Sequence, residues 1–159
     1  MNSESNMYGV QAAEIRELFS DYVRGDADNL VLALSTEPLD DTARNAIEKS
    51  LESFGYGTRA CTYVSLSGFE RDTDADDAAV LDPQALFLLI EGLDPLCMVV
   101  CDSYAISVVH KAYRTALSPN AKTRVFGRTV AAFNDLESLL GSSTGKQKAW
   151  SVLKTLPRR

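Results

Sequence analysis

The sequence predicts an α/β protein with three layers, α/β/α, in which a four-stranded parallel sheet lies between two layers of helices. Helical and strand-like segments alternate along the chain, which is typical of a parallel sheet with helices on both faces. The clearest strand segments are short, continuous apolar runs, as expected for strands that are buried on both faces. We find no internal repeat and no linker, so the 159 residues are expected to form a single domain, 1–159.

Each element follows from the spacing of its apolar residues. The segments with apolar residues three and four positions apart, which predict helices, are residues 10–24, 43–54, 84–92, 103–117 and two shorter stretches within 135–156. The first of these helices belongs to an N-terminal region, residues 1–28, that precedes the sheet. The segments that predict strands are residues 30–34, 60–66, 96–102 and 124–133.

Aspartates and glycines indicate where several elements begin, end or bend. Asp40 or Asp41 is expected to cap the second helix, because its side chain can accept a hydrogen bond from the first turn. Asp82, which is followed by a proline, is a strong start signal for the third helix. Gly92 is expected to end that helix, and Gly127 is expected to kink the last strand.

The net charge of −6 argues against DNA binding, because duplex DNA is bound mainly through Lys and Arg. Acidic residues gather in 70–77, within an exposed loop that we expect over 67–77. Basic residues gather late in the sequence, and ordinary solvated charge is the favoured interpretation of both groups. The basic residues are Lys122, Arg124, Arg128, Lys146, Lys148, Lys154, Arg158 and Arg159.

The sequence favours a cytoplasmic protein that does not enter a membrane. No apolar run approaches the ~20 residues of a membrane span, and the N-terminus lacks a secretory pattern. Cys61, Cys97 and Cys101 lie in predicted strands, where free thiols act as small buried hydrophobes. Cys97 and Cys101 lie roughly 13 Å apart along their strand, too far apart to share a disulfide or a metal. With one histidine, His110, we expect no metal site and no cofactor.

No glycine-rich phosphate loop follows any predicted strand, which argues against a dinucleotide or triphosphate site. The segment Gly141–Lys146 (GSSTGK) is superficially similar to such a loop, but it follows a short helix and its spacing is wrong. His110 lies within an apolar helix and has no evident orienting partner. We therefore favour a helix-surface histidine over a catalytic one.

Polar residues follow three of the predicted strands, at the sheet edge where α/β proteins usually place their sites. Glu37 follows the first strand and could act as a general base, in a loop that Pro38 stiffens. Asp102 ends the third strand, and Asn134 and Asp135 end the fourth. Helix caps need the same residue types at such positions, so capping is the favoured interpretation.

Two stretches give the chain a resemblance to the uracil-DNA glycosylase superfamily. In LDPQALFLLIEGLDPLCMVVCDSYAISVVHKAY, a helix leads through a proline turn into an apolar strand, a turn of small residues and a further helix. RVFGRTVAAFNDLESLLGSSTGKQKAWSVLKTL is similar to the family's final strand, leucine-rich turn and last helix. The resemblance covers the chain from Asn29 onward and implies a uracil-DNA glycosylase-like α/β/α fold.

The family's catalytic motifs are matched only in part. Its glycine-led loop corresponds to Ser35–Pro38, where the proline matches and Glu37 stands where an acid activates water, but the leading glycine is absent. The second strand has no asparagine to recognise a base. The family's His-Pro-Ser motif, whose histidine stabilises the departing base, is replaced by Phe133–Leu136. The branch with an iron–sulfur cluster needs four cysteines, and this chain has three.

We therefore expect a non-catalytic uracil-DNA glycosylase-like domain that acts as a binding or scaffold module in DNA repair or replication, with a protein as its partner. In size and element order the chain is similar to the psi subunits of bacterial clamp loaders, which bridge proteins. The alternative is a divergent hydrolase of N-glycosidic bonds. Its catalytic residues would be Glu37 and Asn134, and its substrate-binding residues Ser35, Thr36, Pro38, Asp102 and Asp135.

Overall fold

The computed structural model describes residues 3–69, 80–120 and 122–159, and the side chains from residue 11 onward except Lys122. Residues 70–77 of the expected acidic loop lie outside the described residues. The strands are β1 (Val23–Arg24), β2 (Val31–Ser35), β3 (Cys61–Ser65), β4 (Cys97–Val100), β5 (Lys122–Val125) and β6 (Arg128–Ala132). The helices are α1 (Ser3–Leu18), the 3-10 turn η1 (Ser20–Tyr22), α2 (Asp41–Ser53), α3 (Pro83–Leu93), α4 (Ser103–Tyr113), α5 (Leu136–Leu139) and α6 (Ser143–Leu153).

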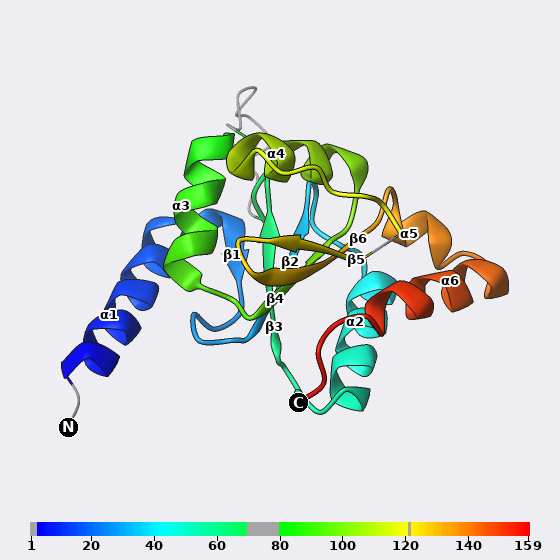
Figure 1. Cartoon of the computed structure of the whole chain (residues 1–159), viewed down its shortest axis with the longest axis horizontal. Coiled ribbons are helices and arrows are strands. Elements are labelled where there is room, and N and C mark those ends of the chain that lie inside the picture. Colours follow the sequence, from blue (N-terminus) through cyan, green and yellow to red (C-terminus); the bar gives the residue numbers. More distant parts are fainter. Residues whose placement is uncertain (1–2, 70–79, 121) are drawn as a thin grey trace.

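One six-stranded mixed sheet, in the order β1-β3-β2-β4-β6-β5, forms the middle layer of the molecule (Figure 1). The four inner strands run parallel, with Ala33 at the centre, opposite Tyr63 on one side and Val99 on the other. The two edge strands, β1 and β5, run antiparallel to their neighbours. The α/β class is confirmed. The prediction of a four-stranded parallel sheet is wrong, because the sheet has six strands and its two outer strands are antiparallel.

The alternation of side chains along the strands builds two apolar layers, one on each face of the sheet. Leu32 and Leu34 of β2 face the layer that packs against α1, α3 and α4. Val31 and Ala33 face the layer that packs against α2, α5 and α6. Continuous apolar strands are therefore required, because both faces of the inner strands are covered. Within the described ranges, no helix has the length and apolar character needed to cross a bilayer.

The predicted last strand, 124–133, is a hairpin rather than one kinked strand. Val125 pairs with Arg128, so Phe126 and Gly127 form a two-residue turn between β5 and β6. Their φ angles are +51° and +82°. Two successive positive φ angles are characteristic of the tight turns that match the twist of antiparallel strands, and they account for Gly127 at this position.

The N-terminal helix was predicted over 10–24, but α1 ends at Leu18 and the chain then forms β1. Val23 is fully buried and pairs with Val64, so burial in the sheet replaces helix formation there. Gly25 has a φ of +117°, and a Cβ atom at this position would lie 2.9 Å from Cα of Thr62. This glycine therefore lets the chain leave β1 close to β3.

The predicted caps of α2 and α3 are confirmed, whereas the predicted end of α3 is wrong. Asp40 caps α2 and Asp82 caps α3, each accepting a hydrogen bond from a backbone N–H, at 2.8 and 2.7 Å. α3 continues past Gly92, and Asp94 follows it in the left-handed conformation. Gly92 instead makes room for α1, because a Cβ atom there would lie 2.6 Å from the Ile15 side chain.

Arg128 departs from the expectation that the late basic residues are solvated charge. It is buried at the start of β6, and its Nε donates to the carbonyl of Pro95 at 2.9 Å. Its guanidinium also pairs with Glu91 and, at 2.6 Å, with Asp94. Arg128 therefore ties the sheet to the end of α3 and is unavailable to bind a ligand.

Candidate functional site

The structure brings the predicted site residues together beyond the C-terminal ends of the inner strands, which lie along one edge of the sheet. Asp102 is at the centre of this edge. Its Oδ2 accepts a hydrogen bond from the backbone N–H of Thr36 at 2.7 Å, and its Oδ1 accepts one from the Thr36 hydroxyl at 2.5 Å. Oδ1 also accepts from the N–H of Ala105 at 2.9 Å and so caps α4. The Asp102 carboxylate therefore joins the end of β2 to the start of α4.

Glu37 lies in the loop after β2, with an exposed side chain beside an exposed Pro38. Its Oε2 accepts a hydrogen bond from the Ser67 hydroxyl at 2.8 Å. Its backbone carbonyl accepts one from the Ser35 hydroxyl at 2.6 Å, and Ser65 donates to the carbonyl of Thr36 at 3.2 Å. These bonds fasten the loop to the end of β3.

Asn134 and Asp135 follow β6 and are both exposed. Asp135 caps α5, accepting from the N–H of Ser138 at 3.1 Å. The backbone carbonyl of Asn134 accepts from the N–H of Ser103 at 2.9 Å, and Asp102 and Asp135 form an isolated antiparallel bridge. These contacts join the ends of β4 and β6 through the backbone and through a helix cap.

Glu137, which the sequence analysis did not single out, lies beside this edge. Its pKa is raised by burial, by a hydrogen bond with Asp40 and by the negative charges of Asp40 and Asp135. Asp40 and Asp135 each cap a helix. The pKa of Glu137 is thus raised because the starts of α2 and α5 pack together and bring these two carboxylates close to Glu137.

A second candidate site lies between α2 and α6, on the opposite side of the sheet from α4. It is a surface hollow of about 470 Å³, which we call the α2–α6 pocket. Small side chains on the facing helices leave this space open. Its lining consists of Thr42, Asn45, Ala46, Lys49 and Ser50 of α2, Lys146, Ala149, Trp150 and Leu153 of α6, and Leu140.

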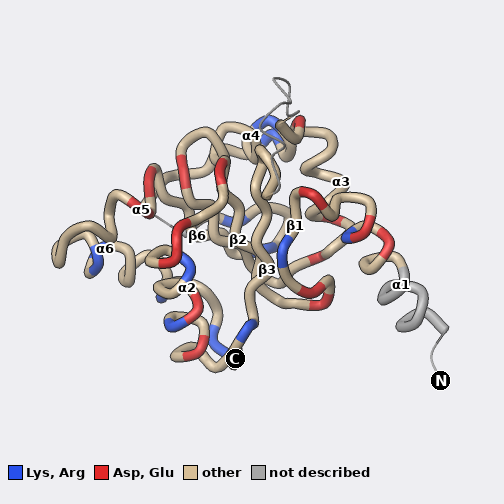
Figure 2. Tube along the Cα trace, turned by 180° about the vertical axis from the view of Figure 1, so that it is seen from behind, with Lys and Arg blue, Asp and Glu red and all other residues tan. Residues whose placement is uncertain are grey.

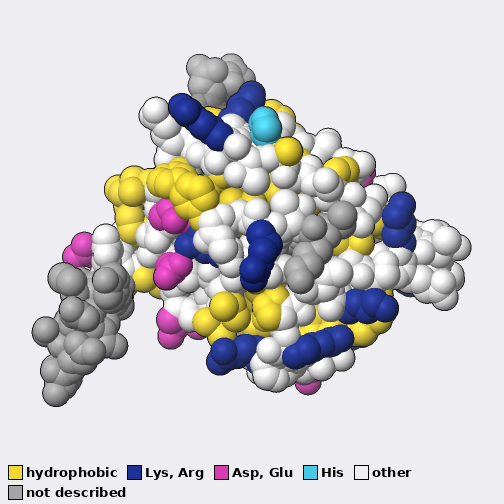
Figure 3. Space-filling model, in the orientation of Figure 1, with side chains coloured by type: hydrophobic (Ala, Val, Ile, Leu, Met, Phe, Trp, Pro, Cys, Tyr) yellow, Lys and Arg dark blue, Asp and Glu magenta, His cyan; other side chains and the backbone are white. Residues whose placement is uncertain are grey.

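The α2–α6 pocket has an apolar floor and a rim that is basic and aromatic. Leu140, Ala149 and Leu153 are buried, whereas Lys49 and Lys146 are exposed. None of the residues that line the pocket is acidic. Figure 2 shows Lys and Arg positions interspersed with Asp and Glu along α2, and further basic positions on α6 and near the C-terminus. In Figure 3 hydrophobic surface lies next to Lys and Arg side chains over the same region.

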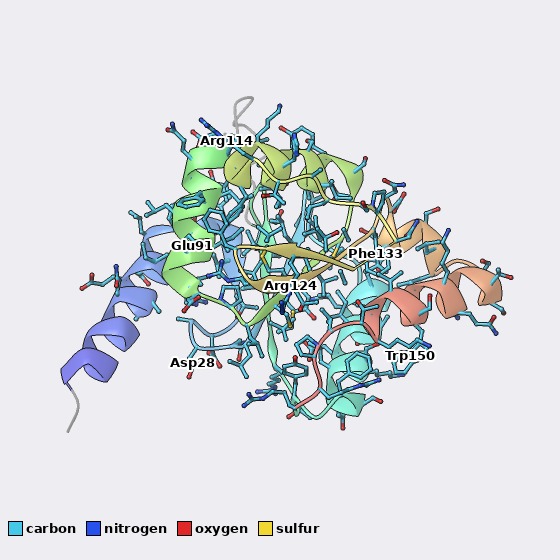
Figure 4. All side chains as sticks on the ribbon, in the orientation of Figure 1. Asp28, Glu91, Arg114, Arg124, Phe133 and Trp150 are labelled. Atoms are coloured by element: carbon cyan, nitrogen blue, oxygen red, sulfur yellow. The ribbon has the colours of Figure 1, made fainter. Side chains whose placement is uncertain are left out.

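Trp150, the single tryptophan of the chain, stands at the rim of the α2–α6 pocket with 41% of its surface exposed (Figure 4). Its ring contacts that of Phe54, with 5.2 Å between the centroids. The guanidinium of Arg158 lies 4.0 Å from the centroid of Phe54. Trp150 is not among the site residues predicted from the sequence, because the pocket it borders is formed by two helices that lie far apart in the chain.

Cys61, Cys97 and Cys101 are buried free thiols, as the sequence predicts. Burial is the main reason that the pKa of each of the three thiols is raised. His110 is exposed on α4, in agreement with the favoured interpretation. Within the part of the chain that the structure describes, no three His, Cys, Asp or Glu residues gather as a metal site would require.

No model of a known protein family matches the chain, and no curated protein matches it. Four surface hollows lined wholly by described residues, the α2–α6 pocket among them, are formed by side chains other than Glu37, Asp102 and Asn134. The α2–α6 pocket and the strand-end residues are therefore two separate candidates.

Proposed function

We propose that this chain is a non-catalytic domain of uracil-DNA glycosylase-like fold that acts as a protein-binding module. The observation that carries the proposal is the structural use of the strand-end carboxylates. Asp102 accepts three hydrogen bonds from its own chain, and Asp135 caps α5. A general base needs an oxygen within reach of a substrate proton. Oε2 of Glu37, the candidate base, also serves the fold, because it accepts a hydrogen bond from the Ser67 hydroxyl.

The fold assignment is supported by the parallel inner strands with helices on both faces, together with the motif resemblance. Loss of catalysis is supported by the hydrogen bonds that hold the loop Ser35–Pro38 in place. The hydroxyls of Ser35 and Ser67 donate to the backbone carbonyl and the carboxylate of Glu37. The histidine of the family's last motif has no counterpart after β6. Removing one donor of that kind costs roughly 10²–10³ in rate.

A protein partner is supported by the composition of the surface. The net charge of −6 disfavours nucleic acid, whose phosphates are bound through many basic residues. Trp150 is exposed beside a hollow, and exposed tryptophan next to an apolar floor is typical of protein interfaces. We place the domain in the cytoplasm, because its three free cysteines suit a reducing compartment. A role in DNA repair or replication rests on the resemblance alone.

A base-release assay tests the absence of catalysis. Oligonucleotides that contain uracil, hypoxanthine or xanthine, single- and double-stranded, would be incubated with the wild type, with Glu37→Ala and with Glu17→Ala, an exposed carboxylate on α1 as control. We expect release at the level of the buffer for all three proteins. Release by the wild type and by Glu17→Ala that is lost in Glu37→Ala would establish the alternative, a divergent N-glycosidic hydrolase with Glu37 as its base.

A further inference from the structure

We propose that the α2–α6 pocket binds a short acidic segment of a partner protein, which inserts an apolar side chain between the two helices. This inference rests on the proposed binding function and names its surface and the chemistry of its partner. It depends on the floor of the pocket, on the charge of its rim and on the way Trp150 is held.

The floor of the pocket selects an apolar anchor. Leu140 and Leu153 are 8% and 2% exposed, and Ala149 beside them is 2% exposed, so the base of the hollow is mainly apolar. Ser50, which is also buried there, donates its hydroxyl to the carbonyl of Ala46 at 2.8 Å. The hollow of about 470 Å³ lies within the size range of protein pockets that bury a ligand group. Moving a large apolar side chain from water into the pocket is favourable. A charged or phosphate group would lose its hydration there, which is unfavourable.

The rim of the pocket selects negative charge. Lys49 from α2 and Lys146 from α6 line it from its two sides, and no carboxylate lines it. This local positive charge contrasts with the net charge of −6 of the whole chain. Asp or Glu residues next to the anchor would meet both ammonium groups, and complementary charge of this kind gives specificity and faster association.

Trp150 is fixed before any partner arrives. Its ring packs on Phe54, which is 1% exposed, and Arg158 covers the Phe54 ring. Ordering an exposed side chain on binding costs free energy, and a preordered tryptophan avoids most of that cost. Tryptophan is also among the residues that contribute most to protein interfaces. Trp150 is therefore suited to contact the partner's anchor.

A protein segment explains the pocket better than a nucleic acid strand does. Single strands are bound along extended basic grooves with aromatic residues on which bases stack. Here the lining supplies two lysines, and the floor is mainly buried leucine and alanine. An acidic peptide with one apolar anchor uses both features.

The test is a peptide selection that is read out by Trp150. The full chain would be used to select binders from a random twelve-residue display library, and each enriched peptide would be titrated against the protein while the fluorescence of its single tryptophan is recorded. We expect enriched sequences with Asp or Glu flanking a Leu, Ile or Phe, and a shift of Trp150 emission on binding. The peptides themselves would be chosen without tryptophan.

Paired variants locate the binding site. The double variant Lys49→Glu/Lys146→Glu is expected to weaken the acidic peptides about tenfold or more, because two exposed charge pairs are lost and replaced by repulsion. Lys111→Glu, an exposed lysine on α4 beyond the other face of the sheet, is the matched control and is expected to leave affinity unchanged. Both variants retain Trp150 as the reporter.

Several outcomes would overturn this inference. They are the absence of enriched peptides, enrichment of basic or uncharged sequences, binding that leaves Trp150 emission unchanged, and equal affinity in the Lys49→Glu/Lys146→Glu variant. Displacement of the peptides by oligo-dT would assign the pocket to nucleic acid, and a dimer that the double variant abolishes would assign it to a second copy. Because base release is measured separately, a failed selection without base release contradicts the pocket assignment and leaves the non-catalytic proposal standing.

Discussion

At the scale of single residues, Asp102 shows how a carboxylate at a typical active-site position can serve the fold. It meets two donors of Thr36 and one of Ala105, so three polar groups depend on one side chain. A buried or half-buried donor that loses its acceptor costs about 1–3 kcal/mol, and a lost helix cap costs about 1 kcal/mol. Asp102 is therefore expected to contribute more to stability than an ordinary cap does.

We expect Asp102→Ala to lower the free energy of unfolding by about 2–3 kcal/mol, measured by urea denaturation. The matched control is Asp82→Ala, which removes the cap of α3, where the structure shows a single capping bond from Ala85. That control is expected to cost about 1 kcal/mol. Equal losses in the two variants would contradict the bridging role of Asp102.

Glu137 gives a residue-scale prediction about pH. Its raised pKa, which is due to burial and to its proximity to Asp40 and Asp135, means that the folded state holds its proton more tightly than the unfolded state does. The charged form is therefore unfavourable at neutral pH, and the penalty disappears as the pH falls through the raised pKa. We expect Glu137→Gln to be more stable than the wild type at pH 7, by at most about 0.5 kcal/mol because the site is largely exposed.

The check is a melting temperature measured from pH 7 down to about pH 4, where carboxyl groups protonate. The advantage of Glu137→Gln should shrink steadily over this range. Glu52→Gln, the same substitution at the far end of α2, is measured beside it as the control. A Glu137→Gln advantage that grows as the pH falls would reverse the sign of the argument.

At the scale of elements, two glycines serve different purposes. A Cβ atom on Gly145 would lie 1.8 Å from the carbonyl oxygen of Leu139, so this glycine lets α6 pack directly on α5. Gly127 has a φ of +82° and nothing within 4 Å of a Cβ atom, so only its backbone conformation requires glycine. We expect Gly145→Ala to cost at least about 2 kcal/mol through overpacking, and Gly127→Ala about 1 kcal/mol through backbone strain.

The two glycine variants also separate by their effect on the α2–α6 pocket. Gly145 is next to Lys146, so displacing α6 should alter the fluorescence of Trp150, whereas Gly127→Ala should leave it unchanged. Denaturation curves and emission spectra of both variants measure these two effects. Unchanged emission in Gly145→Ala would show that the start of α6 does not set the position of the pocket.

The elements also show what the sequence can predict and what it cannot. The starts of α2, α3 and α4 were predictable, because a cap needs a side-chain oxygen at one position, and Asp40, Asp82 and Asp102 supply it. The β5–β6 hairpin was not predictable, because its turn contains a phenylalanine. Phe126 packs against Tyr113 of α4, with 4.9 Å between the ring centroids. A contact from a distant helix therefore supports this turn, and the local sequence does not reveal it.

The candidate sites follow the same distinction. The strand-end residues could be predicted, because each follows its strand directly in the sequence. The α2–α6 pocket could not, because Lys49 and Trp150 come from helices far apart in the chain. Only the packing of α2 beside α6, with small residues between them, places the two side chains on one rim.

At the scale of the whole molecule, the sheet separates two surfaces, and all three thiols lie on one side of it. Cys61, Cys97 and Cys101 belong to the apolar layer under α2, α5 and α6. Because burial raises the pKa of each thiol, the native protein presents little reactive thiolate. We expect a thiol reagent such as DTNB to react with the native protein only as fast as it unfolds, and with all three cysteines at once in urea.

Reaction of one cysteine well before the other two would contradict this expectation, since it would show that this layer opens locally. The layer also forms the floor of the α2–α6 pocket. Local opening of this layer would therefore also disturb the floor of the pocket.

Our central proposal is that this molecule binds its partner at the α2–α6 pocket and not at the strand ends. The most direct test is a map of backbone amide shifts in the ¹⁵N-labelled chain, titrated first with free uracil and then with an acidic peptide from the selection. We expect the peptide to shift amides of α2 and α6, and uracil to shift none. Shifts from uracil at Thr36, Glu37 and Asn134, with none from the peptide near Lys49 or Trp150, would contradict the claim.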